Sequence, residues 1–150
     1  MDLKGYSYSR QDVTAKGLAN AYSQTLGNIF TSEIKPYECE VLVAAVGEST
    51  QTNELFHILY DGSVTDRTGW VAMGGQSDAL GASMEAVYPS NGYPDKLPAL
   101  TEALKMGHDA LTGVGERELP ADTLEVAVLD RTRARRKFAR LTVTELSDLL

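Results

Sequence analysis

The fold is decided by residues 37–73, which read YECEVLVAAVGESTQTNELFHILYDGSVTDRTGWVAM. Three runs in this stretch have the apolar and β-branched character of strands, at residues 37–46, 54–60 and 70–73. After the second run, Asp61-Gly62 is a strong signal for a tight hairpin turn. Because strands joined by hairpins run antiparallel, the stretch predicts an antiparallel sheet.

A helical pattern precedes this stretch. Apolar side chains recur at helical intervals along residues 12–31, and Asp12 is the expected N-cap. Gly17 and Gly27 lie within the predicted helix, where each costs about 1 kcal/mol relative to alanine. We therefore expect another backbone to pack closely against these glycines.

Two more helical patterns and a last strand follow the stretch. Ser77 is the expected cap of the first helix, and Pro98 is expected in the first turn of the second. Residues 124–129 predict the strand, and residues 144–150 predict a short helix. Because the helices stand outside the run of strands, this order predicts an α+β fold, an antiparallel sheet with segregated helices. We expect one domain spanning residues 1–150.

The first two predicted strands, at residues 37–46 and 54–60, are apolar on both faces over much of their length. Such strands are covered on both sides in a folded protein. These residues supply no second covering layer, so we expect the 1–150 domain to be incomplete. Leaving a few hundred Å² of apolar face in water forfeits several kcal/mol, at about 25 cal/mol per Å². A typical domain has a stability of only roughly 5–15 kcal/mol, so we expect the isolated chain to be marginally stable or to self-associate.

Composition and charge narrow the classes of function. The net charge of −7 disfavours non-specific binding to nucleic acid, and no apolar run is long enough to span a membrane. The first residues lack the pattern of a secretory signal, and the single cysteine, Cys39, favours a cytoplasmic location. Cys39 lies in the first strand pattern between Glu38 and Glu40, so we expect a buried and unreactive thiol.

No residue pattern predicts an active site. The two histidines, His57 and His108, have no cysteine or carboxylate at metal-ligand spacing, so we expect each to be a hydrogen-bonded or surface histidine. A Walker-type phosphate loop and a Gly-x-Ser-x-Gly motif are both absent from the sequence. Gly74-Gly75 precedes a helix, and a strand-to-helix turn explains it better than an anion site. The sequence therefore predicts no catalytic residue, no cofactor and no metal.

The densest positive charge lies in residues 131–140, which hold six of the fourteen basic residues of the chain. Phe138 is the only aromatic residue among them, whereas nucleic-acid grooves interleave several aromatic side chains with basic ones. The acidic remainder of the chain also repels phosphate. We expect a solvated hairpin or a docking surface for an acidic partner, and not a nucleic-acid site.

Five segments, taken in order and spacing, resemble a known family. They are GYSYSRQDVT at 5–14, KPYE at 35–38, LYDGS at 59–63, MGG at 73–75 before a helix ending in VY at 87–88, and LEVAVLD at 124–130 before the basic hairpin. Together they resemble the later part of a proteasome α-type subunit, most closely the actinobacterial kind. The resemblance covers essentially all 150 residues.

This resemblance implies a partial four-layer αββα sandwich of the N-terminal-nucleophile hydrolase type. In the family, seven α-type subunits form each outer ring of the 20S core, and the ring gates the entry of substrates. The implied partners are other α-type subunits in a heptameric ring, β-type subunits and an ATP-dependent unfoldase, in the cytoplasm, with no nucleic acid and no membrane. The family segment that carries the gate and the unfoldase-docking lysine has no counterpart here, so no such residue is assigned.

The resemblance also bears on catalysis. In this fold the nucleophile is the first residue of the mature chain, because its free amine serves as the base. The sequence opens with Met1-Asp2, and internal threonines such as Thr14 and Thr123 lack that amine. We therefore expect a non-catalytic subunit that is not itself an enzyme. Two alternatives stay open: a catalytic β-type threonine protease subunit, and a free-standing binding domain that reuses half of the sandwich.

Overall fold

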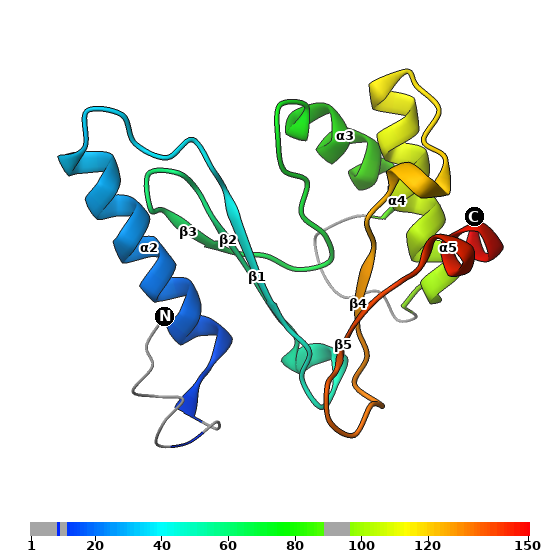
Figure 1. Cartoon of the computed structure of the whole chain (residues 1–150), viewed down its shortest axis with the longest axis horizontal. Helices are drawn as coiled ribbons and strands as arrows, with labels where there is room; N and C mark the ends of the chain where they lie inside the picture. The colour runs from blue at the N-terminus through cyan, green and yellow to red at the C-terminus, as the bar shows by residue number, and fades with distance from the viewer. Residues whose placement is uncertain (1–8, 10–11, 89–96) are drawn as a thin grey trace. The chain divides into compact units, whose positions relative to one another are not determined.

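The computed structural model describes residues 9, 12–88 and 97–150. The chain divides into two compact units, unit 1 (Met1–Arg67) and unit 2 (Thr68–Leu150), and each contains helices and a small antiparallel sheet (Figure 1). The predicted α+β character with antiparallel pairing is confirmed. That residues 1–150 form one domain stays a prediction.

Unit 1 is a helix packed on a three-stranded sheet. Its elements are α2 (Ala15–Ser32), β1 (Val41–Ala45), the short 3₁₀ helix η2 (Thr50–Thr52), β2 (Glu54–Ile58) and β3 (Val64–Asp66). The sheet has the order β1-β2-β3, and both pairings are antiparallel. Helix α2 contacts all three strands (Figure 1). The core of the unit consists of Ala19, Leu26, Val43, Phe56 and Ile58.

Helix α2 begins later than the sequence indicates. The side chain of Thr14 accepts a hydrogen bond of 3.0 Å from the backbone N–H of Gly17, which makes Thr14 the N-cap. Thr14 has the extended backbone that an N-cap requires, with φ −100° and ψ 155°. The expected cap at Asp12 is therefore wrong by two residues. Residues 5–8 and 10–11 of the motif at 5–14 lie outside the described residues.

The predicted hairpin turn at Asp61-Gly62 is confirmed, and it rests directly on α2. Gly62 has φ +87°, and the hydroxyl of Ser23 donates a hydrogen bond of 2.5 Å to its carbonyl oxygen. A Cβ atom on Gly62 would lie 2.5 Å from the carbonyl oxygen of Ser23, and one on Gly27 would lie 3.5 Å from that of Asp61. The close approach expected at Gly27 is thus found. At Gly17 the nearest atom to such a Cβ is the hydroxyl oxygen of its own cap, so among the described residues the expected backbone contact is not found there.

The first two strands are shorter than expected because each needs a partner. Val41 pairs with Ile58, and the chain turns immediately after Ile58, with the N–H of Gly62 bonded to the carbonyl of Leu59. Residues 37–40 extend past this turn and have no strand to pair with. Strand β1 therefore begins at Val41 and not at residue 37, and β2 ends at Ile58 and not at residue 60.

The expected third strand at residues 70–73 is wrong, because the strand that pairs with β2 is β3 (Val64–Asp66). The N–H of Arg67 bonds to the carbonyl of Leu55, the second residue of β2. Strand β2 therefore has no residues left to pair with residues 70–73. Gly69 follows with φ +79°, a turn conformation that interrupts an extended strand. Residues 70–73 belong to unit 2 and have no regular structure.

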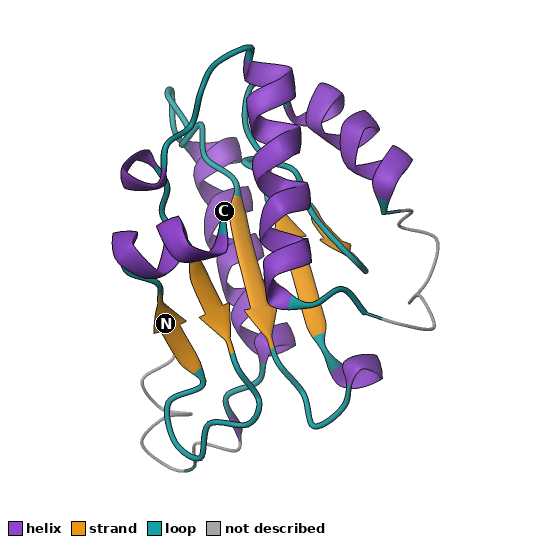
Figure 2. Ribbon diagram, turned by 90° about the vertical axis from the view of Figure 1, so that its right-hand side faces the viewer, coloured by secondary structure: helices purple, strands orange, loops and turns teal. Residues whose placement is uncertain are grey.

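Unit 2 contains two longer helices, a β-hairpin and a short helix. Its elements are α3 (Ser77–Val87), α4 (Leu100–Gly115), η3 (Ala121–Thr123), β4 (Ala127–Leu129), β5 (Phe138–Arg140) and α5 (Val143–Leu149). Helices α3 and α4 contact each other, as Figure 2 shows. The strands β4 and β5 pair antiparallel, with Val128 opposite Ala139. Strand β4 is shorter than the strand predicted at residues 124–129, because its partner β5 spans only three residues.

The two longer helices of unit 2 begin one or two residues away from the positions that the sequence predicts. The N-cap of α3 is Gln76, because the N–H of Leu80 bonds to the carbonyl of Gln76, and Ser77 is the first helical residue. The N-cap of α4 is Ala99, so Pro98 lies outside the helix. There the carboxylate of Glu102 accepts a hydrogen bond of 2.8 Å from the N–H of Ala99. This contact satisfies a donor at the helix start that proline could not offer.

Burial is concentrated in unit 1. In the described part of unit 2, only Ala110 and Leu146 are buried hydrophobic residues. In unit 1, the side chains that alternate with the core residues of β1 and β2 point to the opposite face of the sheet, away from α2. One of them, Leu42, is 43% exposed. Among the described elements of unit 1, α2 is the only long helix, and it covers one face.

Candidate functional site

The sheet face opposite α2 carries the one buried polar side chain among the described residues, His57 of β2. Its Nε2 atom lies 2.6 Å from a carboxylate oxygen of Glu40, so the histidine is hydrogen-bonded, as expected. The side chain of His57 is 10% exposed and that of Glu40 is 29% exposed. His57 lies in the middle strand of this face, directly opposite Leu42 of β1, so the face combines the polar pair with the apolar side chains of Leu42 and Leu55.

The partnership of His57 with Glu40 was not predicted, because seventeen residues separate them. The signal that could have found it is the hairpin register. Leu42 pairs with His57 across the sheet, and Glu40 precedes Leu42 by two residues, so all three lie on one face. A carboxylate diagonal to a histidine is within reach of its ring nitrogen.

His108 of α4 has a structural partner as well. Its Nε2 atom lies 2.9 Å from the carbonyl oxygen of Leu119, and a carbonyl only accepts, so Nε2 carries the proton and donates it. Its Nδ1 atom lies 3.7 Å from a carboxylate oxygen of the exposed Asp109. His108 therefore ties the segment after α4 to the helix. The expectation of a hydrogen-bonded histidine is confirmed here too.

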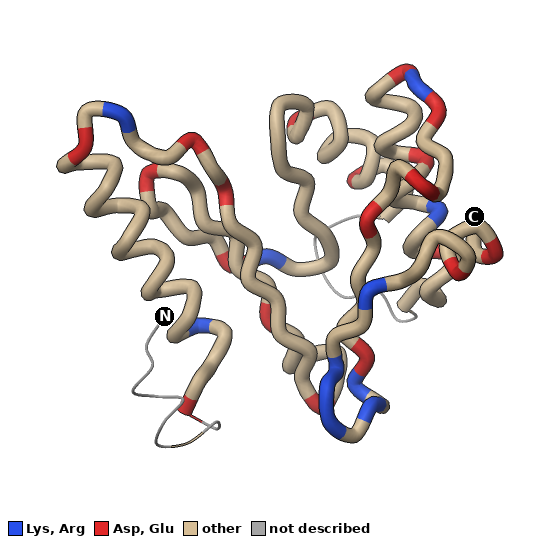
Figure 3. The backbone as a smooth tube through the Cα atoms, viewed as in Figure 1, with Lys and Arg blue, Asp and Glu red and all other residues tan. Residues whose placement is uncertain are grey.

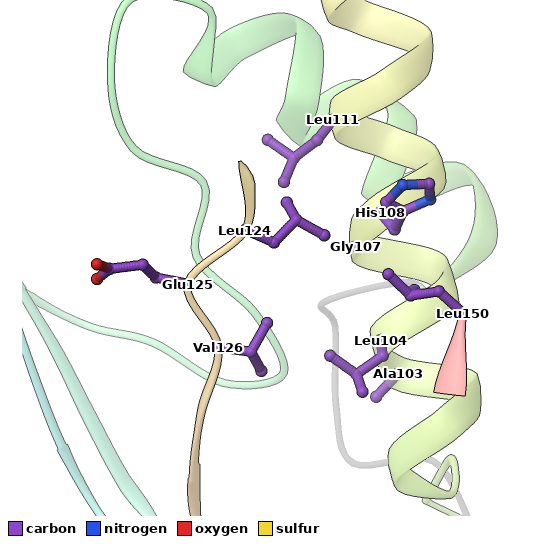
Figure 4. A pocket seen from close by; sticks show the side chains of 9 residues that line it. All are labelled: Ala103, Leu104, Gly107, His108, Leu111, Leu124, Glu125, Val126 and Leu150. Carbon is purple, nitrogen blue, oxygen red and sulfur yellow. The ribbon is translucent and has the colours of Figure 1, made fainter. Parts of the chain in front are cut away.

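A small apolar cavity of about 170 Å³ lies beside α4 (Figure 4). It is lined by Ala103, Leu104, Gly107, His108, Leu111, Leu124, Glu125, Val126 and Leu150. Figure 4 shows the side chains of Leu104, Leu124 and Val126 turned toward one another, and Glu125 turned away from them. Among the described lining residues, no nucleophilic side chain has a base beside it.

A second apolar cavity, of about 290 Å³, also borders α4. It is lined by Trp70, Val71, Ala72, Met73, Leu80, Met84, Gly107, Ala110 and Leu111. The indole N–H of Trp70 donates a hydrogen bond of 2.8 Å to the carbonyl of Tyr88, which fixes the ring beside α3. The two cavities share Gly107 and Leu111 of α4. The two cavities therefore adjoin along α4 within unit 2.

The basic segment at residues 131–140 forms the loop and second strand of the β4–β5 hairpin, and Figure 3 shows its positive charges in blue. Asp130 stands at the base of the loop. Its carboxylate accepts hydrogen bonds from the hydroxyl and the backbone N–H of Thr132, at 2.7 and 2.9 Å. These bonds, and then the charges of Arg133 and Lys137, lower the pKa of Asp130 below its usual value. The predicted hairpin is confirmed.

Cys39 does not behave as expected, because its side chain is exposed. It lies two residues before β1, in the segment that extends past the end of β2, so no neighbouring strand covers it. The expectation of a buried thiol within a strand is wrong. Gly74, with φ +99°, accepts a bond at its carbonyl from the N–H of Ser77, so Gly74-Gly75 forms the expected turn into α3.

The described residues contain no grouping of acid, thiol or imidazole side chains that could hold a metal ion. Two threonine hydroxyls considered as nucleophiles are engaged locally. That of Thr14 accepts the N–H of Gly17, and that of Thr123 donates to the carbonyl of Pro120 at 2.8 Å. Among the helices that the structure describes, none combines the length and apolar character needed to cross a membrane.

Comparison with known proteins identifies the relatives of this chain. The sequence profile of the proteasome family, described as proteasome subunit, matches residues 1–129. The proteasome subunit alpha of Kineococcus radiotolerans is 49% identical over 157 aligned residues, which cover 99% of this chain and 64% of that protein.

Two further relatives carry the same name. The proteasome subunit alpha of Streptosporangium roseum is 50% identical over 149 residues, covering 99% of this chain and 55% of its own length. That of a Parafrankia species is 46% identical over 157 residues, covering 100% of this chain and 63% of its own length. The resemblance predicted from the five segments is confirmed. The chain spans between 55% and 64% of the length of these three relatives.

Proposed function

Because this chain belongs to the proteasome subunit family, we propose that it acts as a non-catalytic α-type subunit of the 20S proteasome core. In this role it takes part in the outer, heptameric ring that controls the entry of proteins for degradation in the cytoplasm. The observation that carries the proposal is an identity of 46–50% to three proteins named proteasome subunit alpha, over at least 99% of this chain. The implied partners are other α-type subunits, β-type subunits and an ATP-dependent unfoldase.

The proposed fold is the αββα sandwich of the N-terminal-nucleophile hydrolases. In such a sandwich a sheet is covered by helices on one face and by a second sheet on the other. Unit 1 supports this proposal, since α2 lies on one face of its sheet and Leu42 is exposed on the opposite face. A second layer over that face would bury Leu42 and Leu55 and leave α2 in place.

A non-catalytic role is supported by the state of the reactive side chains that the structure describes. The hydroxyls of Thr14 and Thr123 serve as local caps and turns. The Nε2 atom of His57 is hydrogen-bonded to the carboxylate of Glu40. The Nε2 atom of His108 is hydrogen-bonded to the carbonyl oxygen of Leu119. The relatives named above are all α-type, so nothing in the comparisons favours the catalytic β-type alternative.

Co-expression with a β-type proteasome subunit tests the proposed assembly. We expect the two chains to co-elute in size-exclusion chromatography at the mass of a multi-subunit complex, and negative-stain images to show rings with seven-fold symmetry. Elution of this chain as a monomer, with the β-type subunit eluting alone, would contradict the proposal.

A pair of variants makes this test specific to the uncovered sheet face. Leu42→Asp places a charge at an exposed apolar position of that face and should abolish co-elution. Asn20→Asp adds the same charge at an exposed position of α2 and should leave assembly intact. Equal behaviour of the two variants would show that this face is not part of the assembly.

A fluorogenic peptide assay tests the non-catalytic assignment. The purified chain should show no hydrolysis, and the complex with the β-type subunit should hydrolyse the peptide. Turnover by the purified chain that a threonine-directed inhibitor blocks would refute the assignment.

A further inference from the structure

The loop and second strand of the β4–β5 hairpin gather positive charge into one short segment. Residues 131–140 contain six basic residues and no acidic one, whereas the rest of the chain contains eight basic and twenty-one acidic residues, a net charge of −13. The hairpin is thus a compact cationic surface on an otherwise strongly acidic chain.

Several of the six cations are partly engaged within the hairpin. Arg133 donates a hydrogen bond of 3.0 Å to the carbonyl of Phe138, and the ammonium group of Lys137 donates one of 2.8 Å to the carbonyl of Arg131. The guanidinium of Arg140 lies 3.9 Å from the carboxylate of Glu125. These contacts join the two ends of the loop and the adjacent strand within the hairpin.

Arg135 and Arg136 stand at the tip of this loop, and both are exposed. In the described part of the chain, neither makes a hydrogen bond or an ion pair. An arginine presents five donors in a planar fork that matches a carboxylate, and two neighbouring arginines on a turn can each take one. The tip therefore has its hydrogen-bonding capacity unused.

Phe138 adds an apolar contact to this charged surface. It lies in β5, two residues after the tip, and its side chain is 48% exposed. Arginine and aromatic side chains are the residue types that dominate the energy of protein–protein contacts. Phe138, two residues after Arg136 in the sequence, therefore gives the hairpin an exposed apolar side chain next to its charged segment.

We propose that the β4–β5 hairpin is a docking surface for an acidic segment of a protein, whose carboxylates pair with Arg135 and Arg136 while an apolar side chain contacts Phe138. A short acidic peptide fits this surface because the positive charge is confined to ten residues. A longer polyanion such as RNA gains less, because the remaining chain carries a net charge of −13 and repels phosphate. The proposal rests on the hairpin and not on the proposed role of the chain in the proteasome.

Fluorescence anisotropy with the full chain tests the proposal. The probe is a fluorescein-labelled twelve-residue peptide in which glutamates alternate with leucines, and the comparison probe is a twelve-nucleotide single-stranded RNA. We expect saturable binding of the peptide at low ionic strength, with weaker binding of the RNA. Tighter binding of the RNA, or no saturable binding of the peptide, would overturn the proposal.

Charge-reversal variants locate the binding. The double variant R135E/R136E should weaken peptide binding by about tenfold or more, since two attractions become repulsions. The control variant K16E/K35E changes the net charge equally at exposed positions of unit 1 and should change the affinity less than about twofold. Equal losses in both variants would show that net charge, and not the hairpin, governs binding. Circular dichroism spectra of both variants should match the wild type, because none of the four side chains contributes to a core.

Discussion

Replacing Gly62 by alanine should destabilise unit 1 more than the addition of a single methyl group suggests. The φ of +87° at Gly62 disfavours any residue with a Cβ, at about 1–2 kcal/mol. The new Cβ would also lie 2.5 Å from the carbonyl oxygen of Ser23 and 2.7 Å from the backbone nitrogen of Gly27. Both atoms belong to the backbone of α2, so the turn itself has to move away from the helix.

That movement breaks the hydrogen bond from the Ser23 hydroxyl to the carbonyl of Gly62, which contributes about 1 kcal/mol. The two effects together give a loss of about 2–3 kcal/mol. The free energy of unfolding would be measured from urea titrations followed by far-ultraviolet circular dichroism. Hydrogen exchange of peptides from α2 would show whether the loss is local, with faster exchange expected across residues 15–32.

Gly74→Ala is the matched control. Gly74 also has a positive φ, +99°, but no atom lies within 4 Å of the position that a Cβ would occupy. The Gly74→Ala variant should therefore lose about 1–2 kcal/mol of stability, from the unfavourable positive φ alone. Hydrogen exchange in α2 should be unchanged. If Gly62→Ala is no more destabilising than Gly74→Ala, or if exchange in α2 stays at the wild-type rate, the close packing of the turn on α2 does not contribute as argued here.

Three further predictions concern side chains described above. Replacing Glu40 by leucine should destabilise the chain by about 1–2 kcal/mol, because the buried imidazole of His57 loses its hydrogen-bond partner. The Glu40→Gln variant should lose less stability, and equal losses of the two variants in urea titrations would contradict this. The pKa values of Asp61 and Asp130 are lowered below 3.8 by hydroxyl and backbone donors two residues downstream. Their stabilisation is therefore fully present above about pH 4 and is lost as the pH falls through the lowered values, so the Asp61→Asn/Asp130→Asn variant should show a weaker dependence of stability on pH below about pH 4. The exposed thiol of Cys39 should react fully with Ellman's reagent in the native state, and a reaction that requires denaturant would show that it is covered.

The parts of the fold that could be predicted are those with a local cause. Asp61-Gly62 specified its turn because glycine accepts the positive φ that the turn needs and aspartate accepts the N–H of Ser63. The periodic pattern at residues 12–31 predicted α2 to within three residues at its start and one at its end. Both signals act over a few residues and need no distant partner.

Strand lengths could not be predicted, because a strand ends where its partner ends. Residues 37–40 continue the apparent strand pattern, yet they extend past the turn after Ile58. Trp70 and Val71 have high β-propensity, yet Trp70 contacts α3 and its indole N–H donates to the carbonyl of Tyr88. Tertiary contacts override strand propensity in this way because that propensity measures packing on a sheet.

The same dependence on register explains what was found and missed among the candidate site residues. The exposure of Cys39 follows from its place beyond the end of β2, and the pairing of His57 with Glu40 follows from Leu42 lying opposite His57. Neither could be derived before the register was known. The family, by contrast, followed from short segments whose order carries the information.

The position of Trp70 gives the chain a built-in optical probe. It is the only tryptophan in the sequence, and its indole bonds to Tyr88 and borders α3, all within unit 2. Indole emission therefore reports on unit 2 alone, while the far-ultraviolet signal averages the helices of both units. Comparing the two signals during one melt separates the unfolding of unit 2 from that of unit 1 without any label.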